Sequence, residues 1–412
     1  MRASRTNLFL IAVSSLFVGI FVGFLAPFPR PGGGGPSCGA GAAGPAAASP
    51  ASPLSALLAA PGSPARHQLD RVVIYGYVQG HTHSFIHASW VKAFKHAGYD
   101  AHWYSDQSPP PAGFSFRNAL VITEGFADGK LPLEPTSVYL VHVLPEAGRA
   151  KYHAAGARLV DLRYNNYFQR DHVYDYDLRA IRREGRLTDL SDASCYEAKP
   201  LADGTVAFYT FWATDLLPDE FDEAAVDAPT EDVSIFVGTV SASNVDNFRR
   251  LTDGCRQLGV RVQHIDPWAH PVDFEENRKL VRKSVIAPDI RGSGDPAKVA
   301  KNDFGTSHKE NGYVACRLFK NISYGKLGGT NSKRMADLFP PGLVIYNDDE
   351  AELAKQCHAR RMDKDLVLKQ MRFVKEKHTY LNRIDDVLRV RPFPHPTAAA
   401  CQRLPGCQSR RS

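Results

Sequence analysis

Residues 71–77 read RVVIYGY, a run of β-branched and aromatic residues that carries Gly76 near its end. Residues 84–97 follow with apolar side chains at helical spacing, and Gly98 stands where a helix C-cap is expected. A buried strand followed by an amphipathic helix is the repeating unit of parallel α/β sheets. Further strand-like runs lie at 100–104, 119–123, 137–142 and 157–162. The first half of the chain therefore predicts a parallel sheet with right-handed crossovers.

A second α/β unit begins near residue 232. Residues 233–239 (VSIFVGT) predict a strand, and residues 244–258 predict a helix. Further strands are predicted at 260–265, 284–288 and 343–346, and a further helix at 313–324. This order predicts an α/β fold of two Rossmann-like domains separated by a deep cleft, the first over residues 70–229 and the second over residues 230–390. One large doubly wound domain is the alternative.

A membrane anchor is predicted ahead of these domains. Residues 7–28 read NLFLIAVSSLFVGIFVGFLAPF without a charged side chain. At a rise of about 1.5 Å per residue, this run just spans a hydrocarbon core of about 30 Å. Arg2 and Arg5 precede the run, so the positive-inside bias predicts residues 1–6 in the cytosol and the domains in a lumen or outside. A cleaved signal peptide is the alternative, because Ala26 is followed by Pro27 at the end of the run.

Residues 29–69 are dominated by Gly, Pro, Ala and Ser, a composition that predicts a disordered stem. The formal net charge is +6, but much of the excess lies at the ends, including a basic tail at 391–412. Composition therefore gives no reason to expect nucleic acid as a partner. A tail, a transmembrane signal-anchor and a stem before a folded unit form the layout of Golgi-resident type II enzymes. The sequence predicts a single-pass protein of the Golgi or endoplasmic reticulum membrane with its folded part in the lumen.

Residues 284–357 carry a family resemblance. The residues that carry it are RLFK at 317–320, ISYG at 322–325 and the strand-like LVIY at 343–346. In this order they resemble the donor domain of GT-B glycosyltransferases, most closely the exostosin-like type. The resemblance implies a transferase that moves a sugar from a nucleotide-sugar donor to a glycan or glycoprotein acceptor. It also implies that the N-terminal domain binds the acceptor.

The leaving group of such a reaction is a nucleoside diphosphate, so the site must stabilise negative charge. Arg317 and Lys320 are the predicted cations, since GT-B enzymes commonly use side-chain cations rather than a metal; no cofactor or divalent metal is expected. The other predicted donor-binding residues are Gly312, Tyr324, Gly328, Gly329, Thr330, Asn331 and Ser332. Residues 328–332 are expected to form a flexible loop whose amides and hydroxyls face phosphate. Surface charge on a solvated helix is the alternative interpretation of Arg317 and Lys320.

An inverting transferase also needs a base for the acceptor hydroxyl. His81 and His83 follow the first predicted strand, where ligands bind in open α/β sheets, and imidazole titrates near neutral pH. Glu124 and Asp128, after the third strand of the first half, are the carboxylate alternatives. His87 and His142 lie at the same predicted edge. Three histidines in one loop can instead bind a metal or cap the helix.

Two other functions stay open. Asp175-Tyr176-Asp177 matches the DxD signature of metal-dependent GT-A glycosyltransferases, although no apolar strand precedes it. Lys320 stands where many enzymes of the resembling type carry a glutamate. That difference is the support for a non-catalytic sugar-binding or scaffold protein on the same fold.

Overall fold

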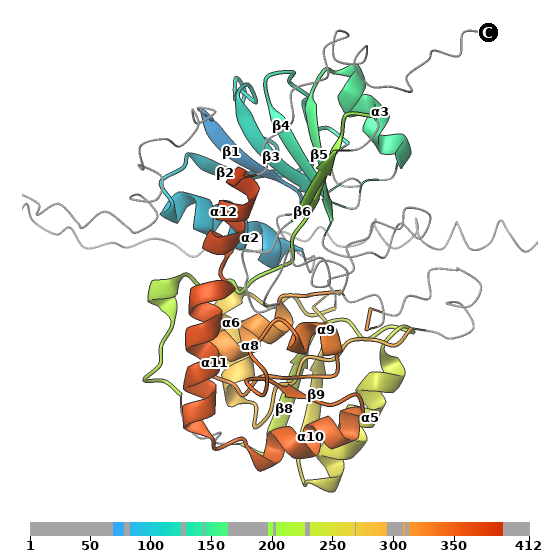
Figure 1. The fold of residues 1–412 in the computed structure, drawn as a ribbon, viewed down its shortest axis with the longest axis vertical. Helices are drawn as coiled ribbons and strands as arrows, with labels where there is room; N and C mark the ends of the chain where they lie inside the picture. Colours follow the sequence, from blue (N-terminus) through green and yellow to red (C-terminus); the bar gives the residue numbers. More distant parts are fainter. Residues whose placement is uncertain are drawn as a thin grey trace, which may run out of the picture. The chain divides into compact units, whose positions relative to one another are not determined.

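Figure 1 shows the fold of this computed structural model. The structure describes residues 69–77, 83–124, 129–142, 144, 146–163, 197–200, 203–226, 231–267, 269–294, 308–309 and 313–389. All of these belong to one compact unit, Leu54–Ser412. The predicted anchor, nearly all of the stem, the basic tail and the DxD segment lie outside the described residues. Among the helices formed by described residues, none combines the length and the apolar character needed to cross a membrane.

The first sheet is mostly parallel, as predicted. Its strands among the described residues are β1 (Arg71–Tyr75), β2 (Ala101–Tyr104), β3 (Ala119–Glu124), β4 (Val138–His142), β5 (Arg158–Arg163), β6 (Glu197–Pro200) and β7 (Val206–Tyr209). Their order in the sheet is β2-β1-β3-β4-β5-β7-β6, and only the β6–β7 pair is antiparallel. Each strand predicted in this half matches an observed strand to within two residues at either end.

Helices cover both faces of this sheet because its strands are apolar on both faces. Val72 and Ile74 belong to one buried cluster, and Val73 and Tyr75 belong to the other, as the period of two in a strand requires. The helices that accompany the first sheet are α2 (Ser84–His96), α3 (Glu146–Ala154) and α12 (Tyr380–Arg389). The last of these lies beside α2 although it ends the described chain (Figure 1).

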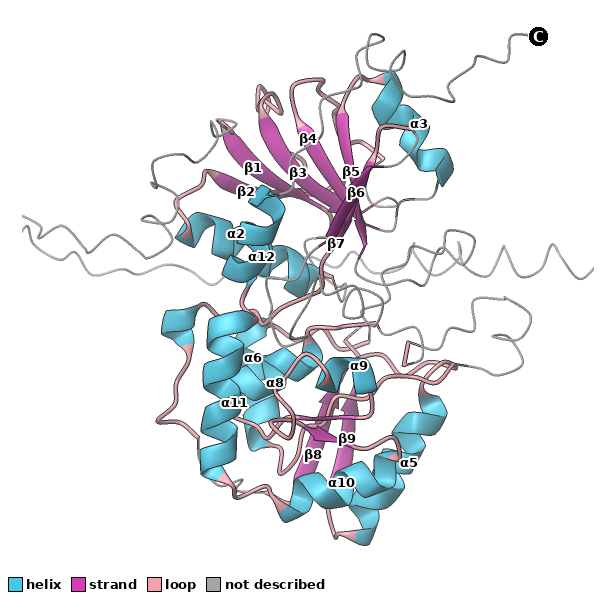
Figure 2. Ribbon diagram, viewed as in Figure 1, coloured by secondary structure: helices cyan, strands magenta, loops and turns pink. Residues whose placement is uncertain are grey.

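The second sheet is assembled from shorter pieces (Figure 2). Its strands are β8 (Val233–Val237), β9 (Arg261–Ile265), β10 (Gly329–Thr330) and β11 (Ile345–Tyr346). β8 pairs in parallel with β9, and β10 pairs in parallel with β11. The predicted strand at 284–288 is an extended segment that links the two pairs. The Val285 amide donates to the Val233 carbonyl at 2.7 Å, and the Asp289 amide donates to the Gly329 carbonyl at 2.8 Å.

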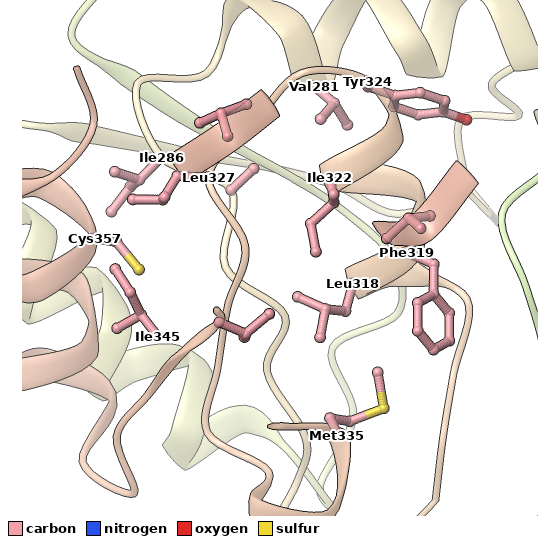
Figure 3. Close-up of a cluster of buried hydrophobic side chains, with 14 of the residues drawn as sticks. Val281, Ile286, Leu318, Phe319, Ile322, Tyr324, Leu327, Met335, Ile345 and Cys357 are labelled. Carbon is pink, nitrogen blue, oxygen red and sulfur yellow. The ribbon is translucent and has the colours of Figure 1, made fainter. Parts of the chain in front are cut away.

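Six helices formed by described residues accompany the second sheet. They are α5 (Val245–Gln257), α6 (Phe274–Lys283), α8 (Arg317–Ser323), α9 (Lys333–Ala336), α10 (Glu350–Ala359) and α11 (Lys364–Lys377). A single turn of 3₁₀ helix, η1 (Pro218–Glu220), lies in the connection between the sheets. Helix α8 starts later than the predicted helix at 313–324. Its Leu318, Phe319 and Ile322 are fully buried in the main cluster of the second sheet, shown in Figure 3.

The two sheets share one strand order. Numbered along the chain, the first reads 2-1-3-4-5 before its two extra strands. The second reads β9, β8, the 284–290 segment, β10 and β11, which is again 2-1-3-4-5. In open α/β sheets a ligand binds at the carboxyl ends of the strands where the order reverses, between the first and third strands. The fold therefore predicts two places where a ligand can bind. The first place follows β1 and β3, and the second place follows β8 and the 284–290 segment.

Candidate active site

The first of these places holds a buried carboxylate among histidines. Glu124, at the end of β3, is fully buried, and its Oε2 lies 2.8 Å from His83 Nδ1. His87 Nε2 lies 3.0 Å from Oε1, and His142 Nε2, at the end of β4, lies 4.0 Å from the same oxygen. Burial by itself would raise the pKa of Glu124. The contacts with His83 and His87 and the field of His142 outweigh burial, so this pKa is held well below its ordinary value and the carboxylate is ionised.

Gly76 makes room for this cluster. A Cβ atom at Gly76 would lie 2.4 Å from His87 Cε1, closer than real contacts allow. The absence of a side chain at Gly76, just after β1, therefore leaves the space that the His87 imidazole of α2 occupies.

The cluster also has the composition of a metal site. His83, Glu124 and His142 offer ligand atoms within 4.8 Å of one another. The shortest contact in the cluster is a hydrogen bond of 2.8 Å between His83 Nδ1 and Glu124 Oε2. The same three side chains could also hold a metal ion.

Among the described residues, the second place holds more positive than negative side chains. Asp289 is fully buried and accepts two hydrogen bonds from Arg291, one of them from Nε at 2.8 Å. Burial opposes the charge on Arg291, but Asp289 outweighs it and the pKa of Arg291 is raised. Arg317 NH1 also approaches Asp289, at 3.9 Å. One carboxylate thus faces two guanidinium groups.

Arg317 is held at the end of β8. Its guanidinium lies 4.2 Å from the centre of the Phe236 ring and donates to the Val237 carbonyl at 3.3 Å. A Cβ at Gly238 would lie 2.0 Å from NH2, so only glycine leaves space for this side chain. Although 23% of the Arg317 side chain is exposed, burial and then repulsion from Arg291 lower its pKa to about 10. Arg317 stays charged at neutral pH, although burial and the neighbouring positive charge of Arg291 disfavour its charged form.

Lys320, one turn along α8, adds a third cation. Only 9% of the residue is exposed, and its Nζ lies 4.0 Å above the centre of the Phe85 ring. Phe85 in turn meets the Phe274 ring edge-on at 4.6 Å between centroids. Among the described residues no ion pair with Lys320 is found, so its charge is met by an aromatic face alone.

A pocket of about 290 Å³ brings the two places together. Its walls include the α2 N-cap residue His83, Phe85 of α2, Gly238 and Thr239 after β8, and Arg291, Arg317 and Lys320. Small-molecule sites have volumes of roughly 300–1,000 Å³, so this pocket accommodates part of a nucleotide sugar. His308, in the same wall, is uncharged at neutral pH because burial and then Arg291 lower its pKa to about 4.

Of the predicted site residues, the structure brings His83, Arg317 and Lys320 to this pocket. Glu124 lies behind His83 and is not part of the wall. Tyr324 is buried, and its hydroxyl donates to Asp215 Oδ2 at 2.6 Å, away from the pocket. His81, Asp128 and Gly312 lie outside the described residues, as do Asp175 and Asp177.

The expectation of a flexible loop at 328–332 was wrong. Gly329 and Thr330 form β10, and residues 328–332 are all buried. Packing requires both glycines, because a Cβ at Gly328 would lie 2.6 Å from Ile322 Cδ1 and one at Gly329 would lie 2.4 Å from Cys357 Sγ. Strand pairing uses backbone groups of this segment. The loop prediction had expected the backbone amides to be free to face phosphate.

The polar side chains of this segment bond within the fold. Thr330 donates to Asp289 at 3.4 Å, and Ser332 caps α9. Asn331 accepts from the Arg291 amide at 2.7 Å and donates to Glu350 at 2.6 Å. Since none of the three lines the pocket, the segment supports Asp289 and Arg291 from behind.

Sequence reasoning missed the Asp289–Arg291 pair. The two residues follow the strand predicted at 284–288, and the rule that ligands bind at the carboxyl ends of strands was the signal that pointed to them. The contact between Lys320 and Phe85 had no such signal. The two residues are 235 positions apart in the sequence (320 − 85), and only the assembled fold joins them.

Comparison with known proteins gives little information about the function of this chain. No protein-family model matches the sequence, and the search of curated proteins found no match. Among solved structures the chain is similar to AviGT4, a glycosyltransferase involved in avilamycin A biosynthesis. The TM-score is 0.43 and the identity 11%, over 77% of this chain and 97% of that chain. The similarity is distant, and it does not transfer the activity of that protein to this chain.

Proposed function

We propose that this protein is a GT-B-type glycosyltransferase that binds a nucleotide sugar in the pocket described above. The observation that carries the proposal is the charge of that pocket. Arg291 and Arg317 share the carboxylate of Asp289, and no described residue forms an ion pair with the buried Lys320, so described cations outnumber the carboxylate. Buried cations are costly unless an anion neutralises them. The diphosphate of a nucleotide sugar brings two negative charges and fits that requirement.

The chemistry on the donor side follows from this charge. When the bond between the anomeric carbon and the diphosphate oxygen breaks, its electron pair stays on the diphosphate. Arg317 offers a planar fork that suits phosphate oxygens, and Lys320 offers a point charge beside it. Both stabilise the leaving group more strongly as its charge grows. Because side-chain cations supply this stabilisation, we propose that a divalent metal on the diphosphate is not needed.

On the acceptor side we propose His83 as the general base of an inverting transfer. An acceptor hydroxyl gives its proton to Nε2 of His83 while its oxygen bonds to the anomeric carbon. Glu124 accepts the Nδ1 proton of the same ring, which fixes the tautomer with a lone pair on Nε2. The burial of Glu124 behind His83 supports an orienting role for it rather than direct contact with the acceptor.

The setting of the reaction is a proposal from sequence alone. The run 7–28 and the stem support a type II protein of the Golgi or endoplasmic reticulum membrane that acts on a glycan or glycoprotein in the lumen.

A thermal-shift screen against UDP-, GDP- and CMP-sugars, with Mn²⁺ and with EDTA, tests the proposal. A ligand at about 100 times its dissociation constant should add roughly 2.7 kcal/mol of stability. We expect one nucleotide class to stabilise the protein equally in EDTA and in Mn²⁺, and to lose that effect in Arg317→Ala. A well-folded protein that none of them stabilises would favour the non-catalytic alternative. Stabilisation only with Mn²⁺ would contradict the metal-independent donor site.

A further inference from the structure

Strand register places two side chains with metal-binding groups next to each other at the end of the first sheet. Glu124, the last residue of β3, pairs with His142, the last residue of β4. Paired residues of neighbouring strands point to the same face of a sheet. Two positions earlier, Ile122 and Leu140 belong to the buried cluster that contains Ile86 of α2. The carboxylate and the imidazole therefore lie on the face that α2 covers.

The N-cap of α2 supplies a third metal-binding group. His83 Nδ1 lies 2.8 Å from Glu124 Oε2, and the rings of His83 and His142 lie 5.1 Å apart between centroids. One donor atom from each of these three side chains lies within 4.8 Å of the others. Donor atoms at about 2.0–2.2 Å from a tetrahedral zinc ion lie roughly 3.4 Å from one another. Side-chain shifts of about 1 Å would therefore bring all three groups to coordination distance.

The neighbouring side chains hold this set in place. Glu124 and His142 are both buried, and the His142 ring meets the Trp212 ring edge-on at 5.6 Å between centroids. His87 Nε2 lies 3.0 Å from Glu124 Oε1, whereas His83 contacts the other carboxylate oxygen. Contacts of this kind, made from outside a ligand set, orient a ligating carboxylate.

We propose that His83, Glu124 and His142 bind a divalent transition-metal ion, with Zn²⁺ preferred, and that this ion inhibits the proposed sugar transfer. Two imidazoles and one carboxylate form one of the ligand sets of zinc sites that keep a coordination position open. Imidazole ligands favour Zn²⁺ over Mg²⁺ and Ca²⁺. Every ion pair of Glu124 with a described residue is with a histidine, so a metal ion would supply the permanent positive charge that a buried carboxylate favours.

The inhibition follows from the two nitrogens of His83, and it rests on the proposed function for the role of this residue as base. A neutral imidazole has one proton and one lone pair. A metal ion on Nδ1 would replace the proton that Glu124 accepts there, and the remaining proton would stay on Nε2. The ring could then no longer accept the proton of an acceptor hydroxyl.

The pocket provides the route for the ion. Of the three proposed ligands, only His83 lines the pocket wall, and 16% of its side chain is exposed. The ion would therefore enter and leave through the pocket. This site is distinct from the proposed diphosphate site at Arg317 and Lys320, so it agrees with a donor site that needs no metal.

The first test measures metal binding without any substrate. Purified full-length protein is treated with EDTA, the chelator is removed, and Zn²⁺ is titrated by calorimetry. We expect one ion per chain, and binding at least about tenfold weaker for Mn²⁺, which stands lowest in the affinity order of these metals. His142→Gln should lose the site, whereas His96→Gln, on the exposed end of α2, should keep it. Equal Zn²⁺ binding by wild type and His142→Gln would overturn the inference.

A measurement on the wild-type protein covers the case in which His142→Gln does not fold. Co²⁺ binds to the ligands that Zn²⁺ uses, and its visible absorption bands report those ligands. We expect new bands when Co²⁺ is added and their loss when Zn²⁺ displaces it. His83→Gln, at the helix N-cap, is the second variant and should show neither effect. A Co²⁺ spectrum that stays that of the hydrated ion in the wild-type protein would contradict the metal site.

The last test measures transfer at a free Zn²⁺ concentration held constant by a metal buffer. Saturating Zn²⁺ should lower the wild-type kcat about 10²-fold, the usual contribution of a general base, and EDTA should restore it. Each variant is compared with its own rate in EDTA. The inhibition should disappear in His142→Gln and persist in His96→Gln. Zn²⁺ that binds in the calorimeter but leaves the rate unchanged would overturn the inhibitory role. Zn²⁺ binding by a protein that transfers no sugar would support the metal site and contradict the proposed function alone.

Discussion

At the carboxyl end of the first sheet, the carboxylate of Glu124 contacts histidines. At the corresponding end of the second sheet, the carboxylate of Asp289 faces both Arg291 and Arg317. The strand order around the two places is the same, and in each a glycine just after the first strand leaves space for a side chain of the candidate site. Gly76 serves His87, and Gly238 serves Arg317.

This comparison teaches that topology and chemistry are set separately. The 2-1-3-4-5 order fixes where a ligand can approach, because side chains after the first and third strands converge there. The residue types at each place then decide which chemistry that place can support. Imidazole and carboxylate exchange protons near neutral pH, whereas guanidinium groups stay charged and hold anions. The proposed glycosyl transfer would need such a division, with proton transfer at one pocket wall and the leaving group at the other.

The largest effect is expected from Arg317→Ala, which removes the cation that we propose for the leaving group. We expect kcat/KM to fall about 10²–10³-fold, the usual cost of losing one donor to developing charge. Thermal stability should change little, because burial and Arg291 already lower the pKa of Arg317 and the folded state does not favour its charge. Initial-rate kinetics and a melting curve measure the two effects.

The matched control for this variant is Arg256→Ala on α5, whose side chain is 73% exposed and pairs with Asp253. It should retain wild-type kinetics. If Arg317→Ala unfolds or melts many degrees lower, Arg317 is a structural residue and the second place is not an anion site.

Glu124→Gln is expected to have the next largest effect. The amide preserves size but cannot fix the His83 tautomer by charge, so kcat should fall about 10²-fold. The dissociation constant for the nucleotide should stay near the wild-type value, because Glu124 does not line the pocket. Steady-state kinetics and nucleotide titration separate these quantities.

The control here is Glu376→Gln, whose side chain is 70% exposed. Weaker nucleotide binding with unchanged kcat in Glu124→Gln would place Glu124 on the donor side and break the division between the two sheets.

Much of the fold was predictable because its strands are short apolar runs bounded by polar and glycine-bearing sequence. β1 and β3–β5 are buried along nearly their whole length, which is what the runs 71–77, 119–123, 137–142 and 157–162 indicate. The return of α12 to the first sheet could not be predicted. Its apolar face fits any buried surface, and only the assembled fold shows that Tyr380 packs on Trp90.

The site was predictable in part for the same reason. His83, Arg317 and Lys320 each follow a predicted strand or lie on a predicted helix near one, so their types and positions sufficed. The segment 328–332 misled because glycines suggest flexibility, whereas Gly328 and Gly329 are there to let Ile322 and Cys357 approach. Sequence shows that a side chain is absent at a glycine but not which neighbour takes the space.

The two strand-end glycines offer the sharpest test of the division between sheets. Gly76→Ala places a Cβ 2.4 Å from His87 Cε1, and Gly238→Ala places one 2.0 Å from Arg317 NH2. We expect Gly76→Ala to lower kcat about tenfold with nucleotide affinity unchanged. We expect Gly238→Ala to weaken nucleotide binding about tenfold, because it moves the guanidinium out of place.

Gly129→Ala is the control for both glycine variants, since its Cβ would meet only Asp106 Oδ2, at 3.4 Å. Equal effects of the two substitutions on kcat and on nucleotide affinity would show that the two ends act as one site without separate tasks.

The smallest effect is expected for His308→Gln and concerns stability in acid. The folded state lowers the pKa of His308 to about 4 from the ordinary 6.5, first by burial and then through Arg291. The unfolded chain therefore binds this proton at higher pH than the folded chain, so stability is lost as pH falls from about 6.5 toward 4. Without the imidazole, the drop in Tm between pH 7.5 and pH 5 should shrink by about 2–4 °C. His96→Gln should leave that drop unchanged, because His96 is exposed. A drop unchanged in His308→Gln would mean that water reaches His308 and screens it from Arg291. The second place would then be open to solvent where the first, around Glu124, is closed.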